Sequence, residues 1–175
     1  RHVTTCLANS IRPDGSTYHT FFIDPLTGKP LHGVTCQGYN DESSWARGQA
    51  WGIYGTALSY RYTKRPEYLD TFRRVLAYYL GRLPKDLVPY WDMIFTDGDD
   101  EPRDSSSAAI AACGLMEAAK YVEPAEAEAW RKLAAQMMKS LVDHYAVKEG
   151  PLGVGLLRHG TYCKKTPFNT CVPAG

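Results

Sequence analysis

Several side chains suited to binding a polar ligand lie close together in residues 37–63, which read QGYNDESSWARGQAWGIYGTALSYRYT. Gln37 opens a polar run, and Trp45, Arg47 and Trp51 follow within the first two turns of an expected helix. Arg47 and Trp51 are four residues apart, so they share one helix face. A flat guanidinium beside indole rings suits a ring-shaped ligand that carries a carboxylate. The alternative interpretation is a core helix whose polar ends are satisfied within the protein.

The helix that would hold these side chains is expected over residues 44–62. Ser43 or Ser44 is expected to cap its N-terminus. A stripe of three glycines, Gly48, Gly52 and Gly55, follows the helix on one side. Because each glycine costs a helix about 1 kcal/mol relative to alanine, the stripe predicts that something packs closely against the backbone there. The apolar face of this helix is formed by Ala46, Ala50, Ile53 and Ala57.

Hydrophobic periodicity predicts further helices along the chain. Residues 1–9 are expected to form the last turns of a helix, and a second helix is expected from Pro66 to about Leu83. A third helix is expected to begin with Asp104 or Ser105 as its cap and to run to about residue 122. Pro124 opens a fourth helix. Its core face is expected to contain Trp130, Ala134, Met137, Leu141 and Tyr145.

Long loops separate these helices, and one of them has the pattern of a small β-hairpin. Residues 17–23 alternate around aromatic and β-branched side chains, and residues 33–36 are expected to pair with them. Further long loops span residues 84–103 and 147–175. The short connections within the helix pairs place every long loop at one rim, at the N-terminal ends of the helices over 44–62 and from 104. The fold class is therefore all-α, with stacked helical hairpins and a loop-bearing rim where chemistry is expected.

Composition and cysteine usage restrict the class of protein. Hydrophobic residues make up 44% of the 175 residues and charged residues 22%, as in ordinary globular domains. A net charge of +1 argues against a nucleic-acid partner, and no run is long and apolar enough to span a membrane. The five cysteines lack zinc-site spacing, so no metal and no cofactor are expected. Cys163 and Cys171 could pair, but free thiols and a cytoplasmic location are expected.

The ends of the sequence also carry an expectation. The chain begins without Met or an apolar leader, and it ends in Asn-Thr-Cys-Val-Pro-Ala-Gly. We therefore expect both ends to lie inside a longer protein.

Four strings identify a family resemblance: RPDGSTYH, QGYNDESSWARGQAWGIYG, PYWDM and DSSSAAIAACGLMEAA. They resemble family 88 of the glycoside hydrolases, the unsaturated glucuronyl hydrolases. The resemblance implies an (α/α)6 barrel of six helical hairpins. Residues 1–175 would then be a single-domain fragment from the middle-to-C-terminal part of that barrel. A self-sufficient helical-repeat domain is the alternative.

The resemblance also implies an activity. Members of the family hydrolyse unsaturated uronyl disaccharides or oligosaccharides made by polysaccharide lyases, by hydrating the C4=C5 double bond of the terminal sugar. The two essential aspartates of the family match no residue here, so they are expected upstream of Arg1. Alternatives are a non-catalytic carbohydrate-binding or degenerate relative and a helical interaction scaffold. The source polysaccharide, its sulfation and the oligomeric state stay open.

Within the matched strings, five residues correspond to the substrate-binding half of the family's site. His19 matches a histidine close to the uronate. Gln37 and Arg47 match residues that hydrogen-bond the sugar and its carboxylate region. Trp45 and Trp51 match aromatic walls of the pocket.

Further polar residues are weaker candidates. The string GTYCKK belongs to a loop that can meet the second sugar in the family, so Lys164 or Lys165 could contact a sulfate there. Asp41 and Asp104 lie at positions typical of helix caps, and capping is the simpler role for both. Asp92 lies in a rim loop, where an exposed carboxylate could contact a sugar.

Overall fold

The computed structural model describes residues 2–148 and 155–164. Over these residues the protein is rich in helix and has one small sheet, in agreement with the expected class. No helix of the described residues is both long and apolar enough to cross a bilayer. The elements in chain order are α1 (His2–Asn9), β1 (Thr20–Ile23), β2 (Pro30–Val34), α2 (Ala46–Thr63), α3 (Glu67–Leu80), α4 (Ser105–Ala118), α5 (Pro124–Ser140) and a π-helical turn (Leu141–Tyr145).

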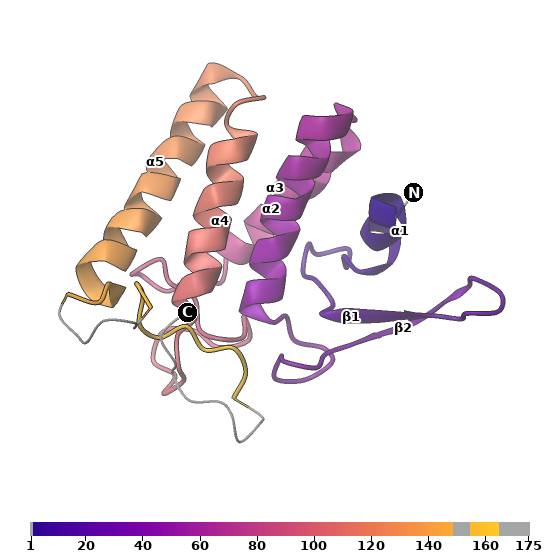
Figure 1. Ribbon diagram of the computed structural model, residues 1–175, viewed down its shortest axis with the longest axis horizontal. Coiled ribbons are helices and arrows are strands. Elements are labelled where there is room, and N and C mark those ends of the chain that lie inside the picture. Colours follow the sequence, from indigo (N-terminus) through magenta and orange to yellow (C-terminus); the bar gives the residue numbers. More distant parts are fainter. Residues whose placement is uncertain (1, 149–154, 165–175) are drawn as a thin grey trace.

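Helices α2 and α4 lie side by side, with α3 packed on α2 and α5 packed on α4 (Figure 1). The two central helices approach each other closely at Gly114 of α4. A Cβ atom there would lie 2.8 Å from Cγ2 of Ile53 and 3.1 Å from the backbone of Tyr54. Only a glycine permits this approach, and its role is not apparent from the sequence of α4 alone.

The glycine stripe of α2 is only partly in close contact. A Cβ atom at Gly52 would lie 3.2 Å from side-chain carbons of Thr17 and Val75, and one at Gly48 would lie 3.1 Å from the Trp45 ring. At Gly55, by contrast, none of the described atoms lies within 4 Å of that position. The prediction of close packing is therefore confirmed at the first two glycines and wrong at the third.

Buried apolar side chains of all four long helices form one core. Rings of Phe72 and Trp130 meet at 4.8 Å and join α3 to α5. The expected core face of the fourth helix is confirmed, although its last residues belong to the π-helical turn. The buried members of that face are Trp130, Ala134, Met137, Leu141 and Tyr145.

The expected hairpin forms, with shifted bounds. β1 and β2 pair antiparallel, with Thr20 opposite Val34 and Phe21 opposite Gly33. Both strands are short and lie outside the helical layers (Figure 1).

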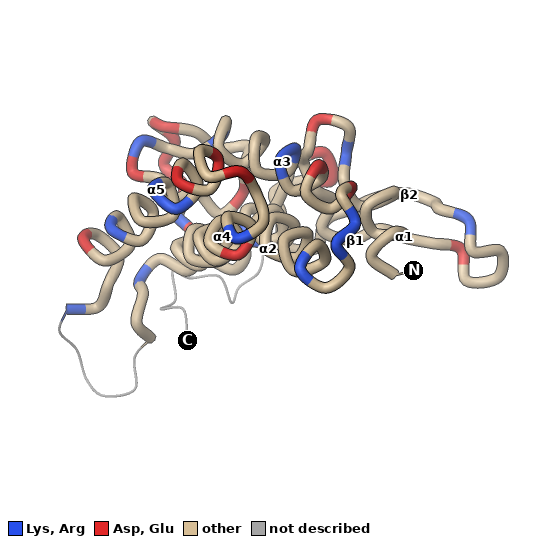
Figure 2. Tube along the Cα trace, turned by 90° about the horizontal axis from the view of Figure 1, so that it is seen from above, with Lys and Arg blue, Asp and Glu red and all other residues tan. Residues whose placement is uncertain are grey.

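Long loops meet at one rim, as predicted. Short backbone bridges join Trp45 to Asp92 and Asp104 to Gly160 at the starts of α2 and α4. Ala46 N donates to Trp91 O across 3.2 Å, so a loop carbonyl accepts from the first residue of α2. Figure 2 shows basic and acidic residues interspersed over the described helices and loops, as expected for a net charge of +1.

The predicted helix caps are wrong in their chemistry. The N-cap residue of α2 is Trp45, and it makes no side-chain cap. The Ser44 hydroxyl donates instead to Oε1 of Gln49 (2.9 Å). Asp104 does occupy the N-cap position of α4, but its carboxylate does not cap the helix. Asp41 caps no helix either, because its Oδ1 accepts from the backbone N of Thr35 (2.8 Å).

Candidate substrate-binding site

Four of the six predicted site residues come together at the N-terminal end of α2. His19 directly precedes β1, Gln37 follows β2, and Trp45 and Arg47 lie at the start of α2. Tyr162, from the last described loop, joins them. We call these five residues the rim cluster. Lys165, the sixth predicted residue, lies outside the described residues, and Trp51 lies apart from the cluster.

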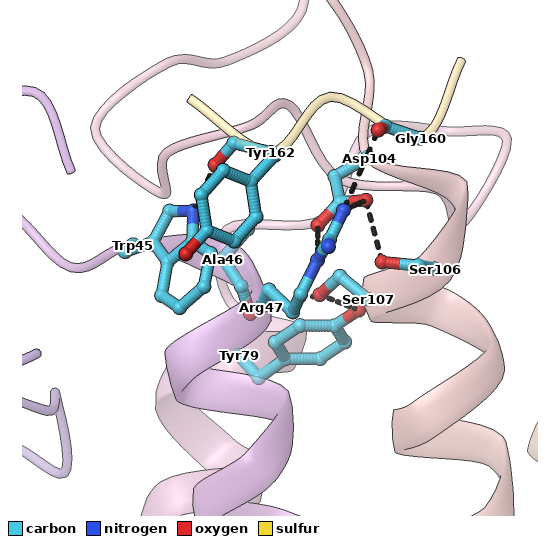
Figure 3. Close-up of polar contacts among 9 residues, drawn as sticks. All are labelled: Trp45, Ala46, Arg47, Tyr79, Asp104, Ser106, Ser107, Gly160 and Tyr162. Carbon is cyan, nitrogen blue, oxygen red and sulfur yellow. Dashed lines mark hydrogen bonds and ion pairs between the residues drawn. The ribbon is translucent and has the colours of Figure 1, made fainter. Parts of the chain in front are cut away.

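Tyr162 connects the other members of the rim cluster. Its hydroxyl accepts a hydrogen bond from Nε2 of Gln37 (2.7 Å), and its carbonyl accepts one from Nε1 of Trp45 (2.8 Å). The Trp45 and Tyr162 rings meet edge to face at 5.5 Å, as Figure 3 shows. Tyr162 is 47% exposed, so its ring is accessible from solvent. Sequence reasoning missed this residue because it considered only the lysines of its loop.

His19 is oriented as a neutral donor. Its Nδ1 accepts from the backbone N of Cys36 (3.0 Å) and of Gln37 (3.5 Å). The other ring nitrogen therefore carries the proton. Burial lowers the pKa of His19, which favours this neutral form at pH 7. The ring edge packs on Trp45 at 4.8 Å. His19 is thus suited to donating a hydrogen bond from Nε2 to an anionic or hydroxyl oxygen.

Arg47 already has an internal carboxylate partner. Its Nε lies 3.1 Å from Oδ2 of Asp104 and its Nη2 lies 2.9 Å from Oδ1, a two-pronged ion pair (Figure 3). Nη2 also approaches the carbonyl of Gly160 at 3.4 Å. Among the described residues, the hydrogen bonds of Arg47 are made by Nε and Nη2, and Nη1 has no acceptor there. The pairing with Asp104 was not predicted from the sequence.

Asp104 is completely buried, whereas the Arg47 side chain is 19% exposed. Burial raises the pKa of Asp104, and the Arg47 guanidinium opposes that rise. A further polar contact of the carboxylate is Oγ of Ser106, which donates to Oδ1 (2.7 Å). Asp104 is therefore an interior anion that depends on Arg47 for its charge balance.

Trp51 lies in a separate groove rather than in the rim cluster. It is 51% exposed, and its ring stacks on that of Tyr54 at 6.4 Å. The groove runs between α1 and α2 and has a volume of about 260 Å³. Its walls include Val3 and Leu7 of α1 and Gly52 of α2.

The expectation of an exposed carboxylate at Asp92 is wrong. Asp92 is completely buried, and its Oδ2 accepts from the backbone N of Tyr39 (2.8 Å) and the hydroxyl of Ser43 (2.7 Å). Its Oδ1 accepts from the backbone N of Ile94 (3.0 Å). Asp92 therefore organises two rim loops.

Lys164 also has a protein partner. Its Nζ lies 2.8 Å from Oε1 of Glu101, and the other oxygen of Glu101 accepts from Nε1 of Trp91 (2.9 Å). Within the described part of the chain, no group of three or more His, Cys, Asp or Glu is arranged to hold a metal ion. The rim cluster thus offers aromatic faces, an amide, a neutral imidazole and a guanidinium, groups that suit a sugar ring with polar substituents.

Comparison with known proteins also indicates a carbohydrate-binding site. The sequence model of the family described as Glycosyl Hydrolase Family 88 matches residues 13–170. The unsaturated chondroitin disaccharide hydrolase of Streptococcus agalactiae is 49% identical over 164 residues, which are 92% of this chain and 41% of that protein. The chain therefore spans less than half the length of this curated relative.

Solved structures are similar as well. The crystal structure of unsaturated glucuronyl hydrolase from Streptococcus agalactiae has a TM-score of 0.93 and 45% identity, covering 98% of this chain and 44% of that one. A variant of that enzyme was solved in complex with dGlcA-GalNAc6S. It has a TM-score of 0.83 and 47% identity, covering 94% of this chain and 44% of that one.

Proposed function

Because this chain belongs to glycosyl hydrolase family 88, we propose that it is part of an enzyme that hydrolyses unsaturated uronyl oligosaccharides. Residues 1–175 would form one part of a single (α/α)6 barrel domain. In that barrel, α2 and α4 would belong to the inner ring and their N-terminal ends would face the substrate. The observation that supports this best is the rim cluster, which gathers four of the matched binding residues at those ends.

The proposed reaction is hydration of a vinyl ether. A proton is added to C4 of the unsaturated uronate and water is added to C5. The resulting hemiketal opens, the bond to the neighbouring sugar breaks, and that sugar leaves with a hydroxyl group. This route needs a carboxyl group that can protonate carbon and direct water. We expect that group outside the 175 residues, since the rim carboxylates Asp41, Asp92 and Asp104 are all engaged within the protein.

The rim cluster would supply binding and orientation. Nε2 of His19 and Nη1 of Arg47 can donate to the uronate carboxylate, and the exposed ring of Tyr162 beside Trp45 can cover a sugar face. Gln37 would hold Tyr162 and contact a hydroxyl. Trp51 and Lys165 are proposed as further contacts of the sugars.

The proposed substrates are unsaturated disaccharides or oligosaccharides from glycosaminoglycans. A structurally similar relative was solved with dGlcA-GalNAc6S, and another relative is named an unsaturated chondroitin disaccharide hydrolase. An unsaturated chondroitin disaccharide is therefore the first substrate to test.

The experiment uses the full-length protein that contains this chain. We expect it to remove the ultraviolet absorbance of the conjugated double bond in the unsaturated disaccharide, and to leave the saturated disaccharide intact. His19→Asn can place its amide oxygen near the position of Nδ1 and so still accept from the backbone N of Cys36, but it does not reach the position of Nε2, so we expect weaker binding and slower turnover. Equal cleavage of both disaccharides would contradict hydration, because ordinary displacement at the anomeric carbon needs no double bond. Binding without loss of absorbance would instead favour a carbohydrate-binding relative.

A further inference from the structure

The start of α4 is a junction between three segments that are distant in sequence. Asp104 N donates to Pro89 O (2.9 Å), and Ser105 N donates to His159 O (3.0 Å). The Asp104 carboxylate reaches across to Arg47 at the start of α2 (Figure 3). One buried side chain therefore lies where α2, α4 and the loop that carries Tyr162 meet.

The loop before Tyr162 has a conformation that depends on its surroundings. His159 has a φ of 61°, which is uncommon for a residue with a side chain. Such backbone persists only where neighbouring contacts hold it. Two of those contacts come from α2, because Nη2 of Arg47 approaches Gly160 O at 3.4 Å and Nε1 of Trp45 donates to Tyr162 O.

The Arg47 guanidinium also faces the aromatic rings of the cluster. Its Cζ lies 5.4 Å from the centre of the Tyr162 ring and 5.8 Å from that of Trp45. These distances permit a cation–π attraction. The orientation of the guanidinium is set by its two hydrogen bonds to Asp104, since Nε and Nη2 are spaced to match the two carboxylate oxygens.

We propose that Asp104 is a positioning residue: through Arg47 it sets the place of Gly160 and Tyr162, and so the shape of the sugar-facing wall of the rim cluster. The inference rests on the proposed function for its consequence in catalysis. Asp104 itself is completely buried, so its carboxylate has no surface to offer a sugar. Loss of its charge would free the Arg47 fork, weaken the contact to Gly160 and displace the Tyr162 ring.

The test places 3-fluorotyrosine at position 162 of the full-length protein and records its ¹⁹F resonance without ligand. Asp104→Asn keeps the size of the side chain and removes its charge. We expect this variant to shift and broaden the resonance. With the unmodified tyrosine, we expect it to lower kcat/KM for the unsaturated disaccharide by about 10- to 100-fold, because small displacements of positioning groups have effects of that size.

Glu117→Gln is the matched control. Glu117 is also a buried carboxylate of α4 and pairs with Lys120, but it lies at the other end of the helix. We expect this change to leave the resonance of residue 162 in place. Adding Asp104→Asn to Arg47→Lys should displace the resonance no further than Arg47→Lys alone, because Asp104 acts through the arginine fork.

Each outcome decides between positioning and simple structural support. A folded Asp104→Asn protein with the unaltered resonance would overturn the proposal, as would an equal shift in Glu117→Gln. If Asp104→Asn does not fold, Arg47→Lys alone must displace the resonance, since lysine lacks the fork, and an unchanged signal there would equally overturn it. If Asp104→Asn displaces the resonance but the wild-type protein hydrolyses no unsaturated disaccharide, the positioning role stands and the proposed function is refuted.

Discussion

Replacing Arg47 with alanine should destabilise the protein in a pH-dependent way. The change removes both Arg47 hydrogen bonds from a carboxylate that has no exposed surface, and among the described residues Ser106 is then the neighbour that still donates to it. Breaking a buried ion pair by removing one partner costs about 3–5 kcal/mol in free energy of unfolding. We expect that full cost at neutral pH. There the folded variant must either hold an unpaired buried carboxylate or protonate it, and both cost free energy.

The sign of the pH dependence follows from the pKa of Asp104. Burial raises this pKa in the folded protein and Arg47 opposes the rise, so the Arg47→Ala variant has a still higher folded-state pKa. An unfolded aspartate titrates near pH ~3.9. Above that pH and up to the raised pKa, the folded variant holds a proton that the unfolded chain has lost. Its free energy of unfolding therefore falls with rising pH, by up to about 1.4 kcal/mol per pH unit.

Urea denaturation of the full-length protein measures this dependence. The difference between wild type and Arg47→Ala should be small at about pH 4 and should grow toward about pH 7. In the double variant Arg47→Ala/Asp104→Asn the buried group cannot ionise. The part of the pH dependence that comes from residue 104 should therefore disappear, and the free energy of unfolding at about pH 7 should exceed that of Arg47→Ala. A penalty that is equal at both pH values, with no recovery in the double variant, would refute this reasoning.

Three further predictions concern packing, a buried amide and the isolated chain. Gly114→Ala should lower the free energy of unfolding by about 1–3 kcal/mol, because its Cβ would overlap Ile53 and the Tyr54 backbone. The control Gly81→Ala should be close to neutral in the same denaturation assay, because its Cβ would lie 3.4 Å from the nearest atom. Gln49→Met should cost about 1–3 kcal/mol for each of the carbonyls of Gly15 and Val75 that loses its donor, and unchanged stability would show that water replaces both bonds. Residues 1–175 alone should not remove the absorbance of the unsaturated disaccharide, and consumption at the full-length rate would contradict both the fragment assignment and the need for further carboxyl groups.

Local patterns in the sequence account for the helices but not for their ends. Apolar periodicity predicts α2 through α5 because each helix buries one face against its neighbours. The third helix ends at Ala118 rather than near residue 122, and Lys120 N and Tyr121 N bond to carbonyls three residues back. This tightening of the last turn leaves the apolar pattern unchanged, so periodicity cannot detect it.

The partners of the site residues could not be predicted from local patterns for a related reason. Arg47 and Asp104 are 57 residues apart, and Gln37 and Tyr162 are 125 apart. The helix face shared by Arg47 and Trp51 predicts that they act together, but Arg47 extends to α4 while Trp51 lines the groove against α1. The family resemblance identified candidate residues, and only the folded chain shows which of them meet.

The polar side chains of the rim have two different roles. Three of its aspartates serve the protein itself: Asp41 accepts from Thr35 N, Asp92 joins two loops, and Asp104 neutralises Arg47. The rim-cluster groups proposed to meet the sugar include the neutral imidazole of His19, the guanidinium of Arg47 and the exposed ring of Tyr162. Such groups bind and orient a sugar but protonate carbon poorly. If the proposed hydration occurs at this rim, we expect its acid to come from residues beyond these 175 and to approach across the face that His19 and Tyr162 present.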